Sequence, residues 1–498
     1  MAGNARIEPV SRAFDECDAV AMDRRCFFRR AGSAAMAAAM SGSISCAAVA
    51  ETAAIAELKH ALAGTVLVPG SPEYGARAPD YNLRVEVAPA VIALCARDDD
   101  VAACVRWAKK HAIPIRMRSG GHSYEGFSLG RGIVIDVSQM HAVKVNPETA
   151  TTRIQAGARL GEVYAALSKH GFALAGGACP SVGIAGLTLG GGYGLLSRKW
   201  GLTSDNLISL TMVDAGGRIL EANAERRADL FWASRGGGGG NFGVVTALDF
   251  RVHPVDKVAL YSIEWPAPDA RQVLQAWQDW APFVADDLTC NLSIVAGADS
   301  LKSTGQFVGS KAALRELIKP LASVGSPQVK SWTTGFMDAA RYFGGPEAPK
   351  PVFLKGKSDY ALRKLSSSAI DTLLSHLQEL HGAATGWIQF DNYGGAVNRV
   401  PANATAFVHR AGTLFSAQYN AIWNHAGDAA PPMRWIREFY RAMRPYFSGY
   451  CYVNYCDLDL TDWQTAYYGS NFKRLTTIKA RYDPGNLFRF PQSIPRSR

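Results

Sequence analysis

Glycine is concentrated in three short runs of this sequence, and these runs limit the folds open to the chain more than any other feature. They are RSGGHSYEGFSLG at residues 118–130, GGACPSVGIAGLTLGGGYG at 176–194 and RGGGGGNFGVVT at 235–246. Glycine lets backbone amides approach a bound group and adopt positive φ, which favours anion-binding turns that suit a pyrophosphate. None is a Rossmann fingerprint, because GLTLGGGYG does not follow the first strand of a βαβ unit with an acidic residue about twenty positions on. A plain dinucleotide-binding fold is therefore disfavoured.

The first fifty residues have the pattern of a targeting segment. Twin arginines and a phenylalanine pair in DRRCFFRR, residues 23–30, precede a run of small residues that ends in AVA at 48–50. This order predicts a twin-arginine signal peptide over 1–50, cleaved after Ala50, with the twin-arginine export machinery as partner and a periplasmic or secreted mature protein. A membrane span is disfavoured because glycine and serine interrupt the run. A lipidated Cys46 is disfavoured because the preceding SIS lacks a large apolar residue.

Strand-like and helical patterns alternate over residues 81–255. The chain has 498 residues and is 48% hydrophobic, which is enough for about two or three domains. A helix is predicted over 98–111, since acidic residues open it and basic residues close it. The β-rich run at 207–223 lies in the same region. This alternation predicts an α/β or α+β domain.

The composition changes after residue 255. Residues 256–446 contain long strand-like stretches, notably at 386–397 and 412–423, and helical patterns such as KAALRELIKPLASV. They predict a separate α+β domain with a broad sheet. The segment 447–498 is rich in aromatic residues and contains a helix closed by DPGN.

Charge and cysteine usage exclude two classes of partner. The 53 Lys and Arg residues are scattered among 43 Asp and Glu residues without a basic stripe, so nucleic acid is not a predicted partner. No C-x-x-C pair or metal-ligand spacing occurs beyond residue 50, so no metal is predicted. Apart from Cys179, the pairing of the cysteines in this part of the chain stays open: Cys95, Cys104, Cys290, Cys451 and Cys456.

The order and surroundings of the glycine runs resemble one family. RSGGHSYEG, GGACPSVGIAGLTLGGGYGLLSRKWGLTSDNL, DLFWASRGGGGGNFGVVT and a C-terminal YVNYCDLD…YYGSNFKRLTTIKARYDPGNLF follow one another as in the berberine-bridge-enzyme-like flavoproteins of the vanillyl-alcohol-oxidase superfamily. The resemblance runs from about Ala88 to Ile494. It implies an α+β fold with a two-subdomain FAD-binding domain over 81–255. It further implies a substrate domain with a large antiparallel sheet over 256–446, and a segment at 447–498 that returns to the FAD domain.

The resemblance implies FAD attached to the protein twice. His122 would bond the 8α-methyl group of the flavin and Cys179 its C6 atom, and the two bonds would raise the reduction potential. The alternatives are a turn histidine bonded to water and a buried thiol, although a thiolate in an amide-lined glycine turn is expected to be reactive. GHSYEG also misses the nucleophile elbow G-x-S-x-G by one residue, so a catalytic triad is disfavoured. The other cofactor-binding candidates are Arg118, Ser119, Gly120, Gly121, Ser123, Val182, Gly183, Gly186, Gly190, Val245 and Asn454.

Two short stretches supply candidates for the base. In WIQFDNYGG, strand alternation places Gln389, Asp391 and Tyr393 on one face, a polar row that is unusual for core packing. The similar Q-x-D pattern of family members that oxidise sugars implies that Asp391 is the base or activates it, with Tyr393 as a further catalytic candidate. The alternative for Asp391 is a solvated carboxylate on a strand face.

In YVNY, alternation places Tyr452 and Asn454 on one face while Tyr455 points away. Tyr452 is therefore the predicted phenolate partner, whose high intrinsic pKa a neighbour must lower. If the strand register is shifted by one residue, Tyr455 is the predicted phenolate partner instead of Tyr452. Which of Asp391 and Tyr452 is the base stays open.

Four residues are predicted to contact the substrate, and one to admit dioxygen. The resemblance places Tyr124, Tyr193, Gln389 and Gln418 around the substrate, with ordinary packing as the alternative. Val182 is the third residue after Cys179, a position at which valine in this family leaves room for dioxygen above the flavin. The resemblance thus implies an oxidase that releases hydrogen peroxide.

The function predicted from these features is that of an exported FAD-dependent oxidase. It would transfer a hydride from an alcohol or hemiacetal carbon, best matched by C1 of an oligosaccharide, to bicovalently bound FAD, with dioxygen as the final acceptor. The alternatives are oxidative cyclisation or dehydrogenation of a secondary metabolite by the same fold, and a non-catalytic flavin-loaded binding protein. Hydrogen-bonding side chains around one aromatic surface would favour a sugar.

Overall fold

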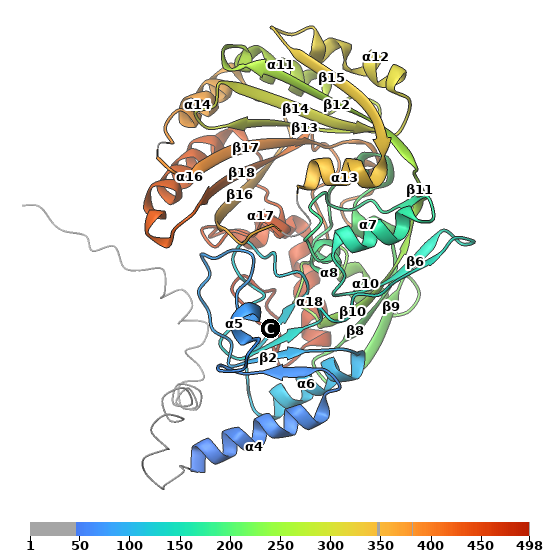
Figure 1. The fold of residues 1–498 in the computed structure, drawn as a ribbon, viewed down its shortest axis with the longest axis vertical. Helices are drawn as coiled ribbons and strands as arrows, with labels where there is room; N and C mark the ends of the chain where they lie inside the picture. The colour runs from blue at the N-terminus through green and yellow to red at the C-terminus, as the bar shows by residue number, and fades with distance from the viewer. Residues whose placement is uncertain (1–45, 346–348, 381, 498) are drawn as a thin grey trace, which may run out of the picture.

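The computed structural model describes residues 46–345, 349–380 and 382–497. Figure 1 shows a large sheet with its helices in the upper half and smaller sheets in the lower half. The predicted twin-arginine motif lies outside the described residues. The first described element, helix α4 (Cys46–Ala61), spans the cleavage position predicted after Ala50. Within the described ranges, no helix combines the length and apolar character needed to cross a membrane.

The lower half contains two main sheets. Their strands are β1 (Thr65–Leu67), β2 (Val91–Leu94), β3 (Ile115–Arg118), β4 (Ile133–Asp136), β5 (Val143–Asn146), β6 (Thr151–Gln155), β8 (Leu207–Val213), β9 (Ile219–Asn223) and β10 (Val244–Arg251). The first sheet has the order β1-β2-β4-β3, in which β4 pairs in parallel with both β2 and β3. The second has the order β5-β6-β10-β8-β9 and is antiparallel. Helix α6 (Asp98–Lys110) contacts strands of both sheets and confirms the helix predicted there.

The upper half is built on one seven-stranded antiparallel sheet. Its strands are β12 (Lys257–Pro266), β13 (Leu288–Val295), β14 (Ser300–Phe307), β15 (Gln328–Gly335), β16 (Phe353–Ala361), β17 (Thr385–Asn392) and β18 (Phe415–Trp423), in the order β15-β12-β14-β13-β17-β18-β16. Its outer face carries the helices α11 (Ala270–Trp280), α12 (Lys311–Ala322), α14 (Ser367–Leu377) and α16 (Ala430–Met443), as Figure 1 shows. The other face is turned toward the lower half. This architecture confirms the predicted α+β fold.

Strand alternation decides which side chains of the sheet face the lower half. In β17, Ile388 and Phe390 are buried against the outer helices, where Trp277 of α11 packs on Phe390 with ring centroids 6.1 Å apart. The intervening residues Gln389 and Asp391 therefore point to the opposite face. The strand ends at Asn392, and in the rest of the stretch that was predicted as strand Tyr393 and Gly394 have no regular structure and the short helix α15 (Gly395–Arg399) begins.

The C-terminal segment packs back into the lower half. Its helix α18 (Phe472–Tyr482) contacts helix α10 (Ala228–Ala233). Lys479 on α18 is fully buried, and its ammonium donates to Asp483 at 2.7 Å and to the carbonyl of Asn241 at 2.6 Å. The charge of the lysine is thus neutralised inside the protein, and the segment is fixed beside the third glycine run.

Short elements complete the chain. These are β7 (Phe172–Ala173), β11 (His253–Pro254), α5 (Tyr74–Arg77), α7 (Leu160–Ser168), α8 (Ile184–Leu189), α9 (Ser197–Trp200), α13 (Phe336–Gly344), α17 (Trp463–Tyr468), η2 (Thr203–Asn206), η3 (Ala267–Asp269), η4 (Ala426–Asp428), η5 (Arg444–Tyr446), η6 (Val453–Tyr455) and η7 (Gly469–Asn471). The cysteines whose pairing the sequence left open are all free thiols, and the sulfur atoms of Cys95 and Cys104 lie 3.9 Å apart in the core.

Candidate active site

One cavity of about 670 Å³ is lined by both halves of the molecule. All three glycine runs reach its wall, through residues such as Gly120, Gly183 and Gly240. Strands β13, β17 and β18 form another side, and residues 452–456 add a third. A cavity of this volume is within the range typical of cofactor and small-molecule sites. Segments far apart in the sequence therefore converge on one site.

The first two glycine runs touch through their backbones. A Cβ atom on Gly120 would lie 2.3 Å from the backbone nitrogen of Gly183, and a Cβ atom on Gly183 would lie 2.4 Å from the backbone nitrogen of Gly120. Contacts this short are possible only for glycine at both positions. The adjacent Ser119 hydroxyl donates to the carbonyl of Ala156 at 2.6 Å and anchors the first turn. The two turns are thereby held at one end of the cavity wall.

His122 lines the cavity from the first turn. Its ring stacks on Tyr81 with centroids 4.4 Å apart, and the Tyr81 N–H donates to the carbonyl of Gly121 at 2.9 Å. Burial, together with the positive charge of Arg159, lowers the pKa of His122 to about 4. The imidazole is thus neutral near pH 7 and keeps a nitrogen lone pair available for bond formation.

Cys179 lines the same cavity from the second turn, and its side chain is accessible there. Burial by the surrounding protein raises the pKa of the thiol. A raised pKa favours the protonated thiol, so the reactive thiolate expected in this turn stays a prediction. Attachment at this position would need the proton to leave first.

Among the predicted cofactor residues, Arg118 lines the cavity but is also held by ion pairs, and Gly190 does not line it. The Arg118 guanidinium donates to Asp136 at 2.8 Å and to the carbonyl of Arg77 at 2.6 Å, so its charge is used inside the protein. Gly190 does not line the cavity, and a Cβ atom there would lie 2.0 Å from Oδ1 of Asn454. Gly190 therefore makes room for Asn454. The remaining predicted cofactor residues line the cavity: Ser119, Gly120, Gly121, Ser123, Val182, Gly183, Gly186, Val245 and Asn454.

The large sheet presents a row of polar side chains to the cavity. Gln389 and Asp391 lie on β17, and Gln389 stands directly opposite Gln418 of β18. The Gln389 amide donates to Oδ1 of Asp391 at 2.9 Å. Asn291 of β13 stands opposite Asp391, and Trp387 adds an aromatic surface to the same face. Polar groups from three strands thus surround one carboxyl group.

Asp391 has the protonation behaviour of a general base. Burial raises its pKa to about 6, while hydrogen bonds from Gln389 and Ser416 act in the opposite direction. A carboxyl group with a pKa near the working pH is ionised at neutral pH and still accepts a proton readily. The site can therefore remove a proton from a hydroxyl group placed beside Asp391.

Tyr452 also lines the cavity, but burial raises its pKa to about 12. Its hydroxyl oxygen accepts hydrogen bonds from the Gly192 N–H and the Asn454 amide, both at 2.9 Å. Tyr452 is therefore a neutral phenol near pH 7. The segment is the 3₁₀ helix η6 rather than a strand, so the prediction that Tyr455 points away is wrong: Tyr455 lines the cavity and stacks on Tyr124.

The tyrosines predicted near the substrate and the base lie at different depths. Tyr124 lines the cavity, and its hydroxyl oxygen accepts a hydrogen bond from the Gln418 amide at 2.7 Å. Tyr193 also lines the cavity, and its hydroxyl donates to the carbonyl of Asn392. Tyr393 does not line it, because β17 ends one residue earlier and Tyr393 stacks behind Tyr193 at 4.5 Å. Its predicted place in the polar row is therefore wrong.

Sequence reasoning missed several residues of the wall. Trp387 and Asn420 line the cavity two residues from Gln389 and Gln418 on the same strand faces. Extending the period-two pattern by one step would have found both. Asn291 had no local signal, because strand pairing brings it to the site. Thr289, Tyr81, Val352, Leu354 and Ile422 also line the cavity.

Comparison with known proteins identifies the family. A family model described as an FAD binding domain matches residues 89–223, and one described as berberine and berberine like matches 451–495. The uncharacterized FAD-linked oxidoreductase YgaK of Bacillus subtilis (strain 168) is 38% identical over 447 residues, which cover 88% of this chain and 98% of the relative. The chain belongs to the berberine-bridge-enzyme-like FAD-linked oxidoreductases.

Two further comparisons place this berberine-bridge-enzyme-like chain among enzymes. Monolignol oxidoreductase AtBBE-like 13 of Arabidopsis thaliana is 34% identical, with 79% of this chain and 82% of the relative covered. The solved structure of a chitooligosaccharide oxidase matches with a TM-score of 0.83 and 30% identity, over 90% of this chain and 100% of the other. The predicted family, enzyme class and fold are confirmed.

The cavity fits the FAD of a berberine-bridge-enzyme-like oxidoreductase. A Cβ atom on Gly186, which lines the cavity, would meet nothing within 4 Å, so bare backbone faces open space there. Neutral His122 and accessible Cys179 face the same space. Bare backbone amides can approach an anionic cofactor more closely than amides screened by side chains.

Alanine at two glycines should separate folding from cofactor binding. Gly120→Ala forces a methyl group into the backbone of Gly183 and should lower the free energy of unfolding by about 1–3 kcal/mol. Gly186→Ala meets no neighbour and should change stability by less than about 1 kcal/mol, yet reduce the flavin content because its methyl group enters the cavity. Thermal unfolding of flavin-free protein and flavin absorbance per chain measure the two effects. A Gly120→Ala protein as stable as wild type would contradict this account.

Proposed function

We propose that this berberine-bridge-enzyme-like protein is an exported oxidase that converts C1 of an oligosaccharide to a lactone and releases hydrogen peroxide. The composition of the sheet wall carries the proposal. Sugars are recognised by convergent hydrogen bonds around an apolar contact surface. The wall offers Trp387 as that surface, with polar side chains around it: Thr289, Asn291, Gln389, Asp391, Gln418 and Asn420.

His122 and Cys179 would hold the flavin from two adjacent turns. When bound there, FAD supplies the acceptor for the hydride that leaves C1. The neutral imidazole of His122 is ready to form a bond, and the backbone of Gly186 leaves room in the same cavity. The sugar loses two electrons and two protons in all, and dioxygen takes up both pairs to become hydrogen peroxide.

Asp391 is the proposed base. As the C1 carbon loses its hydride, the proton of the C1 hydroxyl passes to the Asp391 carboxylate, whose pKa of about 6 leaves it ionised at neutral pH. Gln389 orients this carboxylate by its hydrogen bond to Oδ1. Tyr452, with a pKa raised to about 12, stays protonated and can donate a hydrogen bond to the substrate.

Two further features support an exported oxidase. Val182 lines the cavity three residues after Cys179, a position that favours access of dioxygen. The twin-arginine motif at residues 23–30 supports export of the folded protein to the periplasm or medium.

A secondary-metabolite substrate is the second candidate. Apolar side chains also line the cavity, including Val352, Leu354 and Ile422. They would suit an aromatic alcohol, the class of substrate named for the relative monolignol oxidoreductase AtBBE-like 13.

Acid precipitation of the purified protein tests the attachment. Flavin should stay with the precipitated chain in wild type, in His122→Ala and in Cys179→Ala, because each single variant keeps one bond. It should leave the chain in the double variant. Absorbance of the pellet and the intact mass of each chain measure this. Colourless wild-type protein would remove the proposed covalent attachment.

A peroxide-coupled assay tests the substrate class. Oligomers of β-1,4-linked glucose and of N-acetylglucosamine should release hydrogen peroxide, and Trp387→Ala should raise KM with a smaller effect on kcat because it removes ground-state contact. Cinnamyl alcohol is the comparison substrate. Turnover of the aromatic alcohol alone would replace the sugar with the second candidate.

The pH dependence tests the base. For wild type, kcat/KM should rise with pH through about 6, as Asp391 loses its proton. Asp391→Asn should lower kcat/KM by about 10²–10⁴-fold and remove this limb. Tyr452→Phe is the control and should retain the limb near pH 6. A limb that disappears with Tyr452→Phe and persists in Asp391→Asn would assign the base to Tyr452.

Thermal unfolding gives a check that needs no substrate. The pKa of Asp391 is raised to about 6 in the fold from an ordinary value of 3.8, so between these pH values the native state binds more protons than the unfolded state. The free energy of unfolding of wild type should therefore fall as pH rises from 4 to 7, relative to Asp391→Asn, by about 1–2 kcal/mol. If the difference in free energy of unfolding between wild type and Asp391→Asn is the same at pH 4 and pH 7, the pKa of Asp391 is not raised.

A further inference from the structure

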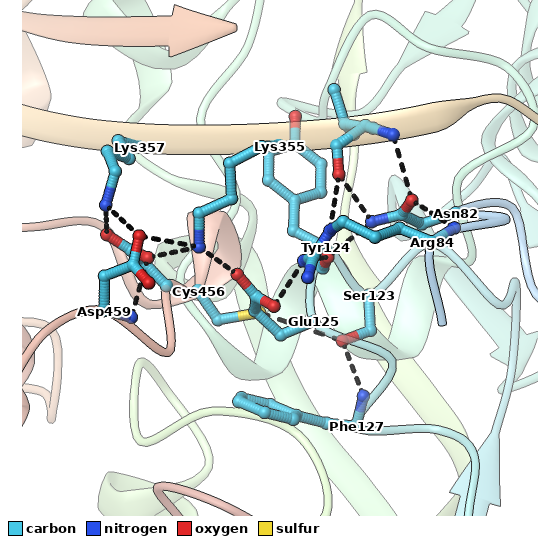
Figure 2. A network of polar contacts seen from close by, with 12 residues as sticks. Asn82, Arg84, Ser123, Tyr124, Glu125, Phe127, Lys355, Lys357, Cys456 and Asp459 are labelled. Carbon is cyan, nitrogen blue, oxygen red and sulfur yellow. Dashed lines mark hydrogen bonds and ion pairs between the residues drawn. The ribbon is translucent and has the colours of Figure 1, made fainter. Parts of the chain in front are cut away.

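A buried ion cluster joins three segments that are far apart in the sequence. The Lys355 ammonium of β16 donates to Oε1 of Glu125 at 2.5 Å, as Figure 2 shows. It also donates to Oδ1 of Asp457 at 2.5 Å. All three side chains are at most 2% exposed. Arg84 pairs with the second oxygen of Glu125, and Lys357 donates to the second oxygen of Asp457 at 2.6 Å. Each carboxylate is therefore bound from two sides.

Each member of the cluster lies next to a residue of the cavity wall. Glu125 directly follows Tyr124 and is three residues after His122, while Asp457 is two residues after Tyr455. Asn82 ties the first turn to the sheet as well. Its amide donates to the carbonyl of Tyr124 at 2.7 Å and to the carbonyl of Leu354 on β16 at 2.9 Å.

Two stacked rings lie beside the cluster in the sequence. Tyr124 and Tyr455 stack with centroids 5.4 Å apart and planes 10° apart. On the sheet side, a Cβ atom on Gly356 would lie 2.6 Å from the Tyr124 ring, so the ring lies directly against the backbone of β16. Gly356 is the residue after Lys355. The lysine that binds Glu125 is thus adjacent to the point where the Tyr124 ring meets the strand.

Stability alone does not explain such a cluster. Replacing a buried ion pair by apolar groups of similar size is often neutral or stabilising, so the benefit of ions lies more in geometry than in free energy. Burial acts to lower the pKa of Lys355, but the carboxylates of Glu125 and Asp457 outweigh burial and raise this pKa to about 12. The lysine therefore stays charged across the working range of pH.

The second turn is held by different contacts. The Tyr164 hydroxyl donates to the carbonyl of Gly177 at 2.6 Å, and the Gly161 N–H donates to the carbonyl of Pro180 at 2.9 Å. Both contacts come from helix α7 and its first turn. The turn that carries Cys179 thus has its own support, separate from the ion cluster.

We propose that Glu125, Lys355 and Asp457 are positioning residues. Through them the seven-stranded sheet holds the His122 turn and the Tyr124–Tyr455 pair against the cavity. Their effect is selective. They directly fix the turn that carries the histidine and one side of the cavity wall, while the turn that carries the cysteine meets that turn at Gly183 and has contacts of its own from α7.

Hydrogen exchange tests this selectivity without reference to bound flavin chemistry. Lys355→Met keeps the length of the side chain, and its carboxylate partners retain Arg84 and Lys357. Amide exchange over 118–127 should rise roughly tenfold while exchange over 176–180, which precedes the contact with Gly120, stays unchanged. Tyr164→Phe is the matched control, with the opposite pattern expected. A uniform rise over both segments in Lys355→Met, or none, would overturn the proposal.

The second measurement rests on the covalent attachment proposed above. Lys355→Met combined with Cys179→Ala leaves the histidine bond alone and should lose most of its acid-stable flavin. Lys355→Met combined with His122→Ala leaves only the cysteine bond and should keep its acid-stable flavin. Equal loss in both backgrounds would mean a merely structural role and would refute the positioning role.

Failure of the covalent attachment and failure of the Lys355→Met variant to fold lead to different measurements. If wild type itself holds no acid-stable flavin, the attachment fails and hydrogen exchange alone decides the positioning role. If Lys355→Met does not fold, the milder isosteric variant Glu125→Gln replaces it, because the cluster then keeps Lys355 paired with Asp457. The same two segments are compared, with the same outcomes for and against the proposal.

Discussion

The backbone contact between Gly120 and Gly183 is the constraint on which the site depends. It brings two turns from different parts of the lower half together with no side chain between them. His122 and Cys179 then face one cavity although 57 positions separate them in the chain. A methyl group at either glycine would separate the turns. The chemistry of the histidine and the cysteine thus follows from the absence of a side chain at two neighbouring positions.

The buried charges around the cavity differ in whether they are paired. Asp391 is the carboxyl group in the cavity wall whose protonation changes near pH 6. Two basic side chains near the cavity are neutralised within the fold: Arg118 by Asp136, and Lys355 by Glu125 and Asp457. Asp391 has polar neighbours on the sheet but no such ion pair among the described residues, so burial raises its pKa. The contrast between paired and unpaired buried charges distinguishes the framework of the site from its proposed base.

Local patterns in the sequence were sufficient for much of the fold and for part of the site. Acidic and basic ends predicted the helix at 98–111, and alternation predicted the inward face of Gln389 and Asp391, because both depend on neighbours in the chain. Tyr393 failed because strand β17 ends at Asn392, and Tyr455 failed because its segment forms a 3₁₀ helix. The ion cluster had no local signal at all, since its members come from positions 125, 355 and 457. Pairing between remote segments decides such features, and one sequence does not reveal it.

The return of the C-terminal segment to the lower half has a consequence for the order of events during synthesis. Residues 452–456, together with Arg489 and Phe490, form part of the cavity wall. A ribosome that has made only the first 255 residues has therefore produced both glycine turns but not a closed cofactor pocket. The wall of the cavity is complete only once the last stretch of the chain has emerged and docked. The finished length of the polypeptide is thus a prerequisite for a complete cofactor pocket.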